Sequence, residues 1–124
     1  MQNSNQKFKT DLIGRCYKFG LAVIKLTDSL PNKRSAWVIA DQVIRSATSV
    51  GANLVEARAS SSRLEFKKFY EISLKSANES DYWLSLLKDA NLAKSENIDA
   101  LQSELRELCR MIAASVIKLK ERKL

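Results

Sequence analysis

The sequence has 124 residues and carries 21 lysine and arginine side chains against 14 aspartate and glutamate side chains, for a net charge of +7 at pH 7. It contains no histidine, so the commonest general base and the commonest transition-metal ligand are both absent. This composition argues against an enzyme, a metal site or a bound cofactor. The positive charge favours a polyanionic partner, nucleic acid first. The length predicts a single domain over residues 1–124.

The two cysteines, Cys16 and Cys109, both fall at apolar positions of helical patterns. No signal-peptide pattern precedes them, and no apolar run approaches the ~20 residues that a membrane-spanning helix needs. These features predict buried free thiols, a cytoplasmic location and no membrane partner.

The first two helices are predicted from apolar residues that recur at steps of three and four. The first helix is expected from about Lys7 to Ser29, and Leu30-Pro31 ends it, because proline disfavours a helical residue before it. Ser35 is the predicted N-cap of the second helix. The two stripes are formed by Leu12, Cys16, Phe19, Val23, Leu26 and Leu30, and by Ile39, Val43, Ala47, Val50 and Leu54.

The last two helices are predicted in the same way. Ser62 followed by Glu65 is typical of a capping box, which places the start of the third helix after Ser62. The stripe of this helix is aromatic at its ends and small in its middle: Phe66, Tyr70, Ser73, Ala77, Ser80, Trp83, Leu84 and Leu87. A turn over residues 94–97 leads to the fourth helix, whose stripe is Ile98, Leu101, Leu105, Leu108, Ile112, Val116 and Leu119.

Four amphipathic helices with short joints, and no strand-like alternation, predict an all-α fold, an antiparallel up-down-up-down four-helix bundle. The core residues expected to be buried are Leu12, Phe19, Val43, Ala47, Val50, Leu105, Leu108 and Ile112.

A pattern of polar residues links the second and third helices. It reads Gln-x-x-Arg-x-x-x-Ser-x-x-x-Asn-x-x-Glu, then a short loop and Glu-Phe at the start of a helix. In this chain it is formed by Gln42, Arg45, Ser49, Asn53, Glu56, Glu65 and Phe66, with Ala57 where glycine is usual. From roughly residue 30 to the C-terminus, the chain resembles the four-helix-bundle proteins encoded in intervening sequences of bacterial large-subunit rRNA genes.

The resemblance implies a fold more than an activity, because most members of that family have no known activity and the motif holds no catalytic grouping. Relatives of this fold include the accessory proteins of diversity-generating retroelements, which form barrel-shaped pentamers and bind a reverse transcriptase and nucleic acid. By resemblance, a homopentamer is the expected assembly, and RNA, DNA or a reverse transcriptase are candidate partners. The chain is more similar to the rRNA group than to the retroelement group.

Four polar residues beside the apolar stripes form a candidate site: Arg45, Asn53, Glu56 and Glu79. One interpretation is a ligand or RNA pocket. The favoured interpretation is a structural polar network or a subunit contact, because paired charges inside bundles often specify arrangement. A carboxylate metal site is not expected, since several oxygen ligands in near-octahedral array would be needed.

Basic residues cluster at the second joint and near the C-terminus. In an antiparallel bundle these two regions lie at the same end, so the candidate nucleic-acid-binding set is Arg58, Arg63, Lys67, Lys68, Lys118, Lys120, Arg122 and Lys123. The alternative is a solvated face whose cations offset the carbonyl groups at a helix C-terminus.

Aromatic and surplus apolar residues bear on assembly. Trp37, Tyr70, Tyr82 and Trp83 raise the question of base stacking. Core packing or subunit contact is the favoured use, because Trp83 continues an apolar stripe and Trp37 lies at a helix entrance. Apolar residues left outside the stripes favour a homo-oligomer: Trp37, Ile72, Leu74, Leu86 and Leu92.

The sequence thus predicts a non-enzymatic, oligomeric bundle that presents a basic surface to nucleic acid, RNA first, and that is associated with rRNA or accessory to a reverse transcriptase. The alternative is a protein-interaction or scaffold module that does not bind nucleic acid.

Overall fold

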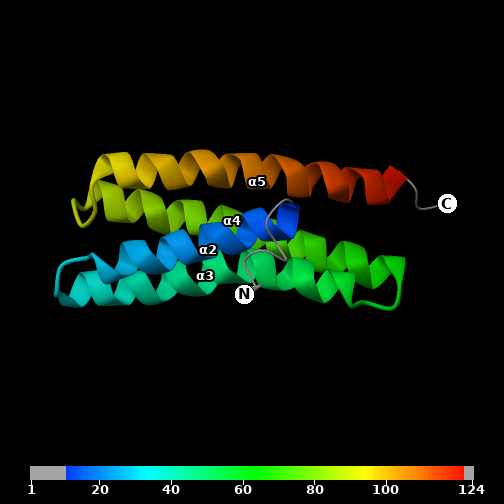
Figure 1. Ribbon diagram of the computed structural model, residues 1–124, viewed down its shortest axis with the longest axis horizontal. Coiled ribbons are helices and arrows are strands. Elements are labelled where there is room, and N and C mark those ends of the chain that lie inside the picture. The colour runs from blue at the N-terminus through cyan, green and yellow to red at the C-terminus, as the bar shows by residue number, and fades with distance from the viewer. Residues whose placement is uncertain (1–10, 122–124) are drawn as a thin grey trace, which may run out of the picture.

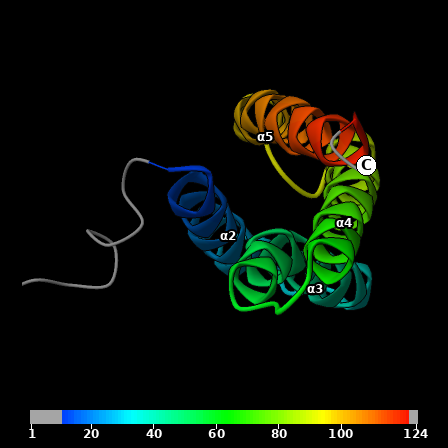
Figure 2. The same ribbon diagram turned by 90° about the vertical axis from the view of Figure 1, so that its right-hand side faces the viewer.

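The computed structural model describes residues 11–121, which form four helices: α2 (Leu12–Asp28), α3 (Arg34–Arg58), α4 (Arg63–Asp89) and α5 (Ser95–Glu121). Successive helices run in opposite directions, as predicted for an up-down-up-down bundle (Figure 1). Viewed from the end, α3 lies between α2 and α4, and α5 packs on α4 (Figure 2). The helix order and the all-α class are confirmed.

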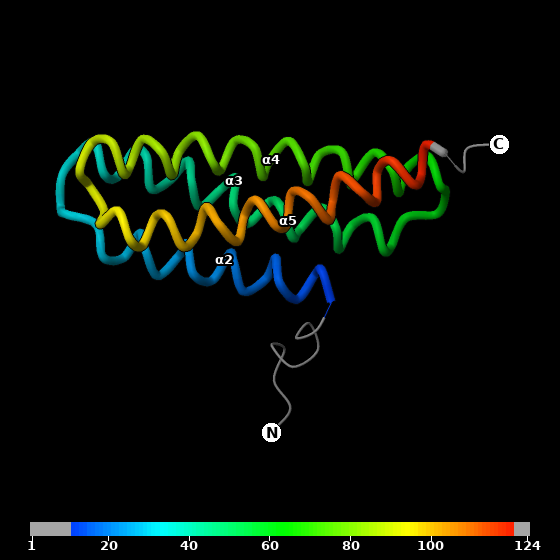
Figure 3. Tube along the Cα trace, turned by 90° about the horizontal axis from the view of Figure 1, so that it is seen from above, coloured from blue at the N-terminus to red at the C-terminus, as the bar shows by residue number. Residues whose placement is uncertain are grey.

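The joints gather at the two ends of the bundle. The α2–α3 and α4–α5 joints lie at one end, whereas the α3–α4 joint and the end of α5 lie at the other (Figures 1 and 3). The helix α2 has 17 residues and is shorter than its partners, so it stops short of the second end.

The start of α2 is set by Asp11. Its backbone is extended, and its Oδ1 accepts a hydrogen bond from the Gly14 amide at 2.7 Å. This is an N-cap interaction, so the helix begins at Leu12. The predicted start at Lys7 lies outside the described residues.

The predicted N-cap of α3 was wrong. The helix begins at Arg34, after Lys33 in extended conformation, and Ser35 is already its second residue. Lys33 donates its amide to Pro31 O at 2.9 Å, and its carbonyl accepts from Trp37 N at 3.1 Å. Backbone hydrogen bonds in the turn after Pro31 therefore start α3 at Arg34, two residues before the start that a Ser35 N-cap predicts.

The other two joints follow local rules. The predicted N-cap is confirmed, since Ser62 Oγ accepts from Glu65 N at 3.1 Å, and the return bond joins Glu65 Oε1 to the amide of Ser61, one residue before the cap, at 3.0 Å. At the α4–α5 joint Asn91 has a φ of 59°, in the left-handed region that asparagine tolerates better than most residues.

The core runs along the bundle axis and contains the predicted buried residues with one correction. Phe19, Val43, Ala47, Val50, Leu105, Leu108 and Ile112 are buried. Leu12 is only partly buried, and Ile13 takes the core position. Leu12 is the first residue of α2, so it lies at the end of the helix, where fewer neighbouring residues cover it.

Small hydroxyl side chains lie at the contact between α3 and α4. Ser80 Oγ donates to Ser46 Oγ at 2.9 Å, and Ser73 Oγ donates to Val50 O at 2.7 Å. All three serines are fully buried, and each has a hydrogen-bond partner. Their small volume lets the two helices approach closely, as the small middle of the predicted α4 stripe indicated.

Candidate nucleic-acid interface

The basic residues of the second joint and of α5 meet at one end of the bundle, on the right in Figure 1. Arg58 is the last residue of α3, and Arg63 is the first residue of α4. Both line a shallow hollow of about 360 Å³ that Leu119 of α5 also lines. The predicted convergence of the second joint with the last helix is therefore present. Arg122 and Lys123 lie outside the described residues.

Two members of this basic set already have acidic partners. Arg58 Nη2 lies 3.2 Å from Asp11 Oδ2, and both side chains are about half exposed. Lys67 Nζ lies 3.4 Å from Glu71 Oε2, one turn along α4. Surface pairs of this kind contribute at most about 1 kcal/mol, so they break readily when a phosphate competes.

The unpaired charge at this end belongs to three lysines. Lys68, Lys118 and Lys120 are exposed, and none forms an ion pair with another side chain among residues 11–120. We use "basic end" below for these lysines together with Arg58 and Arg63. Two apolar side chains are also exposed in this part of the bundle, Leu64 at 74% and Ile117 at 56%.

The four residues of the predicted polar network do not form one group, because the alignment of α3 against α4 places them at different levels along the bundle. Arg45 forms an ion pair with Glu79, and Glu79 also accepts a hydrogen bond from Trp83 Nε1 at 2.9 Å. The indole N–H and, after it, the guanidinium hold the pKa of the Glu79 carboxyl below its ordinary value. This carboxylate is therefore held ionised as a structural link between the helices.

Asn53 belongs to a separate group. Its Nδ2 donates to the carbonyl and to the hydroxyl of Ser49, at 2.9 and 2.8 Å, and Ser49 Oγ lies 2.9 Å from Ser76 Oγ. Glu56 is exposed and forms no ion pair with any described residue. It lies 11 residues beyond Arg45 on α3, about 16 Å along the axis, and so it cannot reach the level of Glu79.

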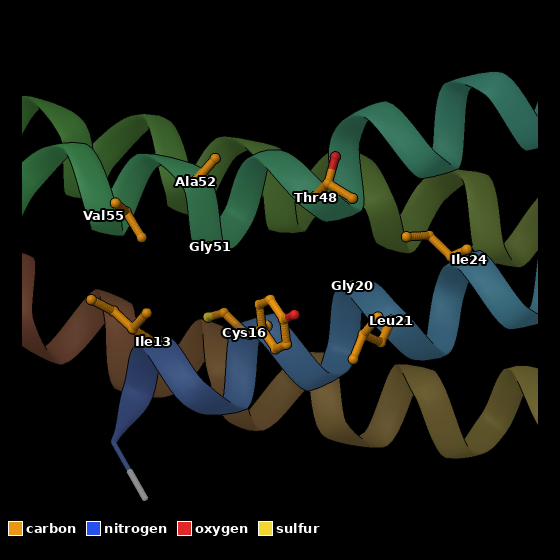
Figure 4. Close-up of a pocket in the computed structure, with 10 residues that line it drawn as sticks. Ile13, Cys16, Gly20, Leu21, Ile24, Thr48, Gly51, Ala52 and Val55 are labelled. Atoms are coloured by element: carbon orange, nitrogen blue, oxygen red, sulfur yellow. The ribbon is translucent and has the colours of Figure 1, made fainter. Parts of the chain in front are cut away.

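An apolar groove runs between α2 and α3 (Figure 4). It encloses about 370 Å³, with Ile13, Cys16 and Ile24 on one side and Gly51 and Val55 on the other. Gly51 permits the close approach of the helices, because a Cβ there would lie 3.2 Å from the Cβ of Cys16. Several rim residues are exposed: Tyr17, Ile24 and Val55.

The cysteines have different surroundings. Cys16 is 2% exposed at the base of the groove, and burial raises the pKa of its thiol to about 12. Cys109 is only half-buried, which corrects the prediction that both are buried, and burial raises its pKa as well. Both thiols are free and are neutral at physiological pH.

The surplus apolar residues divide into three kinds. Leu92 is buried in the core, so it is not available for a subunit contact. Ile72, Leu74 and Leu86 are half-buried on α4. Trp37 is 56% exposed, which rules out core packing for this residue within the single chain.

Sequence reasoning missed the contact that links α2 to α5. The guanidinium of Arg15 donates to both oxygens of Glu104, at 3.1 and 2.8 Å, and its third nitrogen lies 3.3 Å from Met111 Sδ. This fork is the geometry that arginine and carboxylate prefer. The only signal in the sequence was that Arg15 and Glu104, which have opposite charges, each lie beside the apolar stripe of a helix, α2 and α5.

Within residues 11–121, no group of three or more cysteine, aspartate or glutamate side chains is placed to hold a metal ion. Among the described helices, none is long and apolar enough to span a bilayer.

The architecture is that of an antiparallel four-helix bundle whose polar contacts fix helix register and whose cations gather at one end. Comparison with known sequences then places the chain in a family. It belongs to the 23S rRNA-intervening sequence protein family, whose sequence model matches residues 9–114. The match includes α2, which the resemblance from residue 30 onward left out.

A solved structure agrees with this assignment. A crystal structure of a protein of unknown function from the S23 ribosomal protein family of Bacteroides thetaiotaomicron is 29% identical and superposes with a TM-score of 0.81. The alignment covers 86% of this chain and 98% of the other. No match was found among proteins of curated function.

Proposed function

We propose that this protein is a non-enzymatic homo-oligomer that binds RNA through its basic end. The observation that carries the proposal is that the exposed, unpaired lysines Lys68, Lys118 and Lys120 lie at the same end of the bundle as Arg58 and Arg63. Lysine and arginine in such a group bind phosphates without reading the sequence of bases. Each phosphate interaction is weak, but an oligomer would repeat the group and so raise the total affinity.

The family supports RNA, and 23S rRNA in particular, over other polyanions, because the family name ties it to the rRNA genes. A cytoplasmic location follows from that partner. The wider resemblance to retroelement accessory proteins supports two further elements of the proposal: an assembly of five copies and, as a second candidate partner, a reverse transcriptase.

The first test is the salt dependence of RNA binding by the full-length chain. Binding of a labelled single-stranded RNA is expected to weaken linearly on a log–log plot as salt rises, with a slope of about −0.7 for each phosphate that the protein binds. A slope near zero would contradict phosphate binding and would favour the scaffold interpretation.

A scaffold function has one observation in its favour. Leu64 and Ile117 are large apolar side chains exposed in the part of the bundle that carries the basic end. A protein partner would bury them and would be retained at high salt, whereas RNA would not. The same salt titration therefore separates the two functions.

Self-association is proposed to use the apolar groove between α2 and α3. A second copy would cover Tyr17, Ile24 and Val55, which the single chain leaves exposed. Replacing Val55 with glutamate would place an unpaired charge in that interface.

The Val55→Glu variant is expected to have a mass near the 14.0 kDa of one chain by light scattering, whereas the unmodified protein is expected near five times that value. Ile117→Glu is the matched control, because it changes an exposed aliphatic residue remote from the groove. Equal masses for Val55→Glu and the unmodified protein would show that the groove is not the interface.

A further inference from the structure

The end of the bundle opposite the basic end exposes an aromatic side chain. Trp37, in the first turn of α3, has 56% of its surface open to solvent, and its neighbour Val38 has 55%. Trp37 Nε1 donates to Asn32 Oδ1 at 3.1 Å, so the indole is tied to the α2–α3 joint. Trp83, by comparison, is half-buried, and its N–H is bonded to Glu79.

Two cations precede Trp37 by four and three residues, a spacing that places them on the same side of the first turn of α3. Lys33 and Arg34 are exposed, and neither forms an ion pair with another residue of the described chain. They line a broad surface hollow of about 680 Å³ together with Ser35, Val38 and Ile39, and Trp37 lies outside its lining. The first turn of α3 contains no acidic residue, and Asp41, one turn beyond Trp37, is the next carboxylate on the helix.

An exposed ring among cations is the combination that single-stranded nucleic acids bind. A base stacks on the aromatic face while cations contact the phosphates on either side, and each stacked base contributes about 1–3 kcal/mol. Bases inside a duplex are already stacked on each other, so an unpaired base is required. A purely apolar partner would leave Lys33 and Arg34 without a counter-charge, which favours a polyanion over an apolar surface.

We propose that Trp37, with Lys33 and Arg34, is a stacking site for an unpaired base of single-stranded nucleic acid. The inference shares its ligand class with the proposed function but uses a different surface. Trp37 and Arg58 lie 21 residues apart on α3, which separates them by about 32 Å along the helix axis. A strand that is too short to bridge the two ends can therefore test each site by itself.

The first experiment uses tryptophan fluorescence. The chain has two tryptophans, so the Trp83→Phe variant leaves Trp37 as the single emitter. Titration with a single-stranded RNA tetranucleotide is expected to quench this emission, and a blunt duplex of the same composition is expected to leave it unchanged. Equal quenching by both, or by neither, would overturn the proposal.

The second experiment leaves Trp83 in place and measures affinity for the labelled tetranucleotide by anisotropy. Trp37→Ala is expected to weaken binding about 5- to 150-fold, which is the effect of removing the ring on which one base stacks. Trp37→Phe should retain part of the affinity, because a smaller ring still stacks. Equal affinity of the alanine variant and the unmodified protein would refute a stacking role.

Two controls separate this site from the others. Reversing Lys68, Lys118 and Lys120 to glutamate should leave quenching by the tetranucleotide intact even if it abolishes binding of long RNA, so the two proposals fail independently. Light scattering of Trp37→Ala should give an unchanged mass. A fall to the monomer mass with no quenching in the first experiment would assign Trp37 to an interface between copies of the chain and would overturn the proposal.

Discussion

Replacing Leu108 with alanine is expected to lower the free energy of unfolding by about 2–5 kcal/mol. Leu108 is fully buried in α5, between Leu105 and Ile112 of the same core stripe. The substitution removes apolar volume from the packed interior, and a core of this density closes such a space only in part. Urea denaturation followed by circular dichroism measures the change.

The control for this prediction is Ile117→Ala. Ile117 lies on the same helix but is 56% exposed, so its truncation should change stability by no more than about 0.5 kcal/mol. Both variants must be compared at one protein concentration, because the proposed assembly would add stability that depends on concentration. A destabilisation by Leu108→Ala as small as that by Ile117→Ala would show that α5 does not pack as described.

The regular stripes made much of the core predictable. In α5 the residues Ile98, Leu101, Leu105, Leu108 and Ile112 recur at steps of three and four, and all are buried except Leu101, which is partly buried. Leu12 departs from this rule because periodicity describes the face of a helix and not its end.

The helix starts were less predictable, because they depend on the backbone. The prediction that Ser62 is an N-cap is correct, because its side chain accepts the hydrogen bond that the sequence pattern implies. Ser35 was chosen by the same preference, yet the turn after Pro31 starts α3 at Arg34 without a side-chain cap. Side-chain preferences cannot reveal a joint that the main chain closes by itself.

The polar contacts required the register between helices, which a single sequence does not contain. Of the four residues in the predicted network, Arg45 and Glu79 form an ion pair, because they lie at the same level on α3 and α4, as Ser49 and Ser76 do. The same register leaves Glu56 several turns from Glu79. The fork between Arg15 and Glu104 was missed for the same reason, since it depends on how α2 and α5 lie against each other.

Exposure of Trp37 was the least predictable feature of the candidate sites. Its position at the entrance of α3 favoured core packing or a subunit contact, yet 56% of its surface is open to solvent in the single chain. The hydrogen bond to Asn32 holds the indole at the joint, and the short α2–α3 connection offers no side chain that covers it. Whether the Trp37 ring is covered or exposed depends on the three-dimensional path of residues 29–33, which the sequence pattern does not contain.

Reversing the charge of Lys68, Lys118 and Lys120 to glutamate is expected to abolish retention of long single-stranded RNA at moderate salt. These are the exposed lysines of the basic end that have no acidic partner among the side chains of residues 11–120, so their removal deletes phosphate-binding groups. The new carboxylates also repel the strand. At lower salt, where residual binding is measurable, the magnitude of the salt slope should fall by about 0.7 for each phosphate that is no longer bound.

The matched control reverses Lys18, Lys75 and Arg106, which are exposed on the middle turns of α2, α4 and α5 and change the net charge by the same amount. If long-range attraction alone holds RNA, both triple variants lose binding equally; if the basic end is the site, the control keeps most of its affinity and its slope. Helicity and mass should match the unmodified protein in both. Retention of RNA by the Lys68, Lys118 and Lys120 variant with an unchanged slope would contradict the site and leave the scaffold function as the better account.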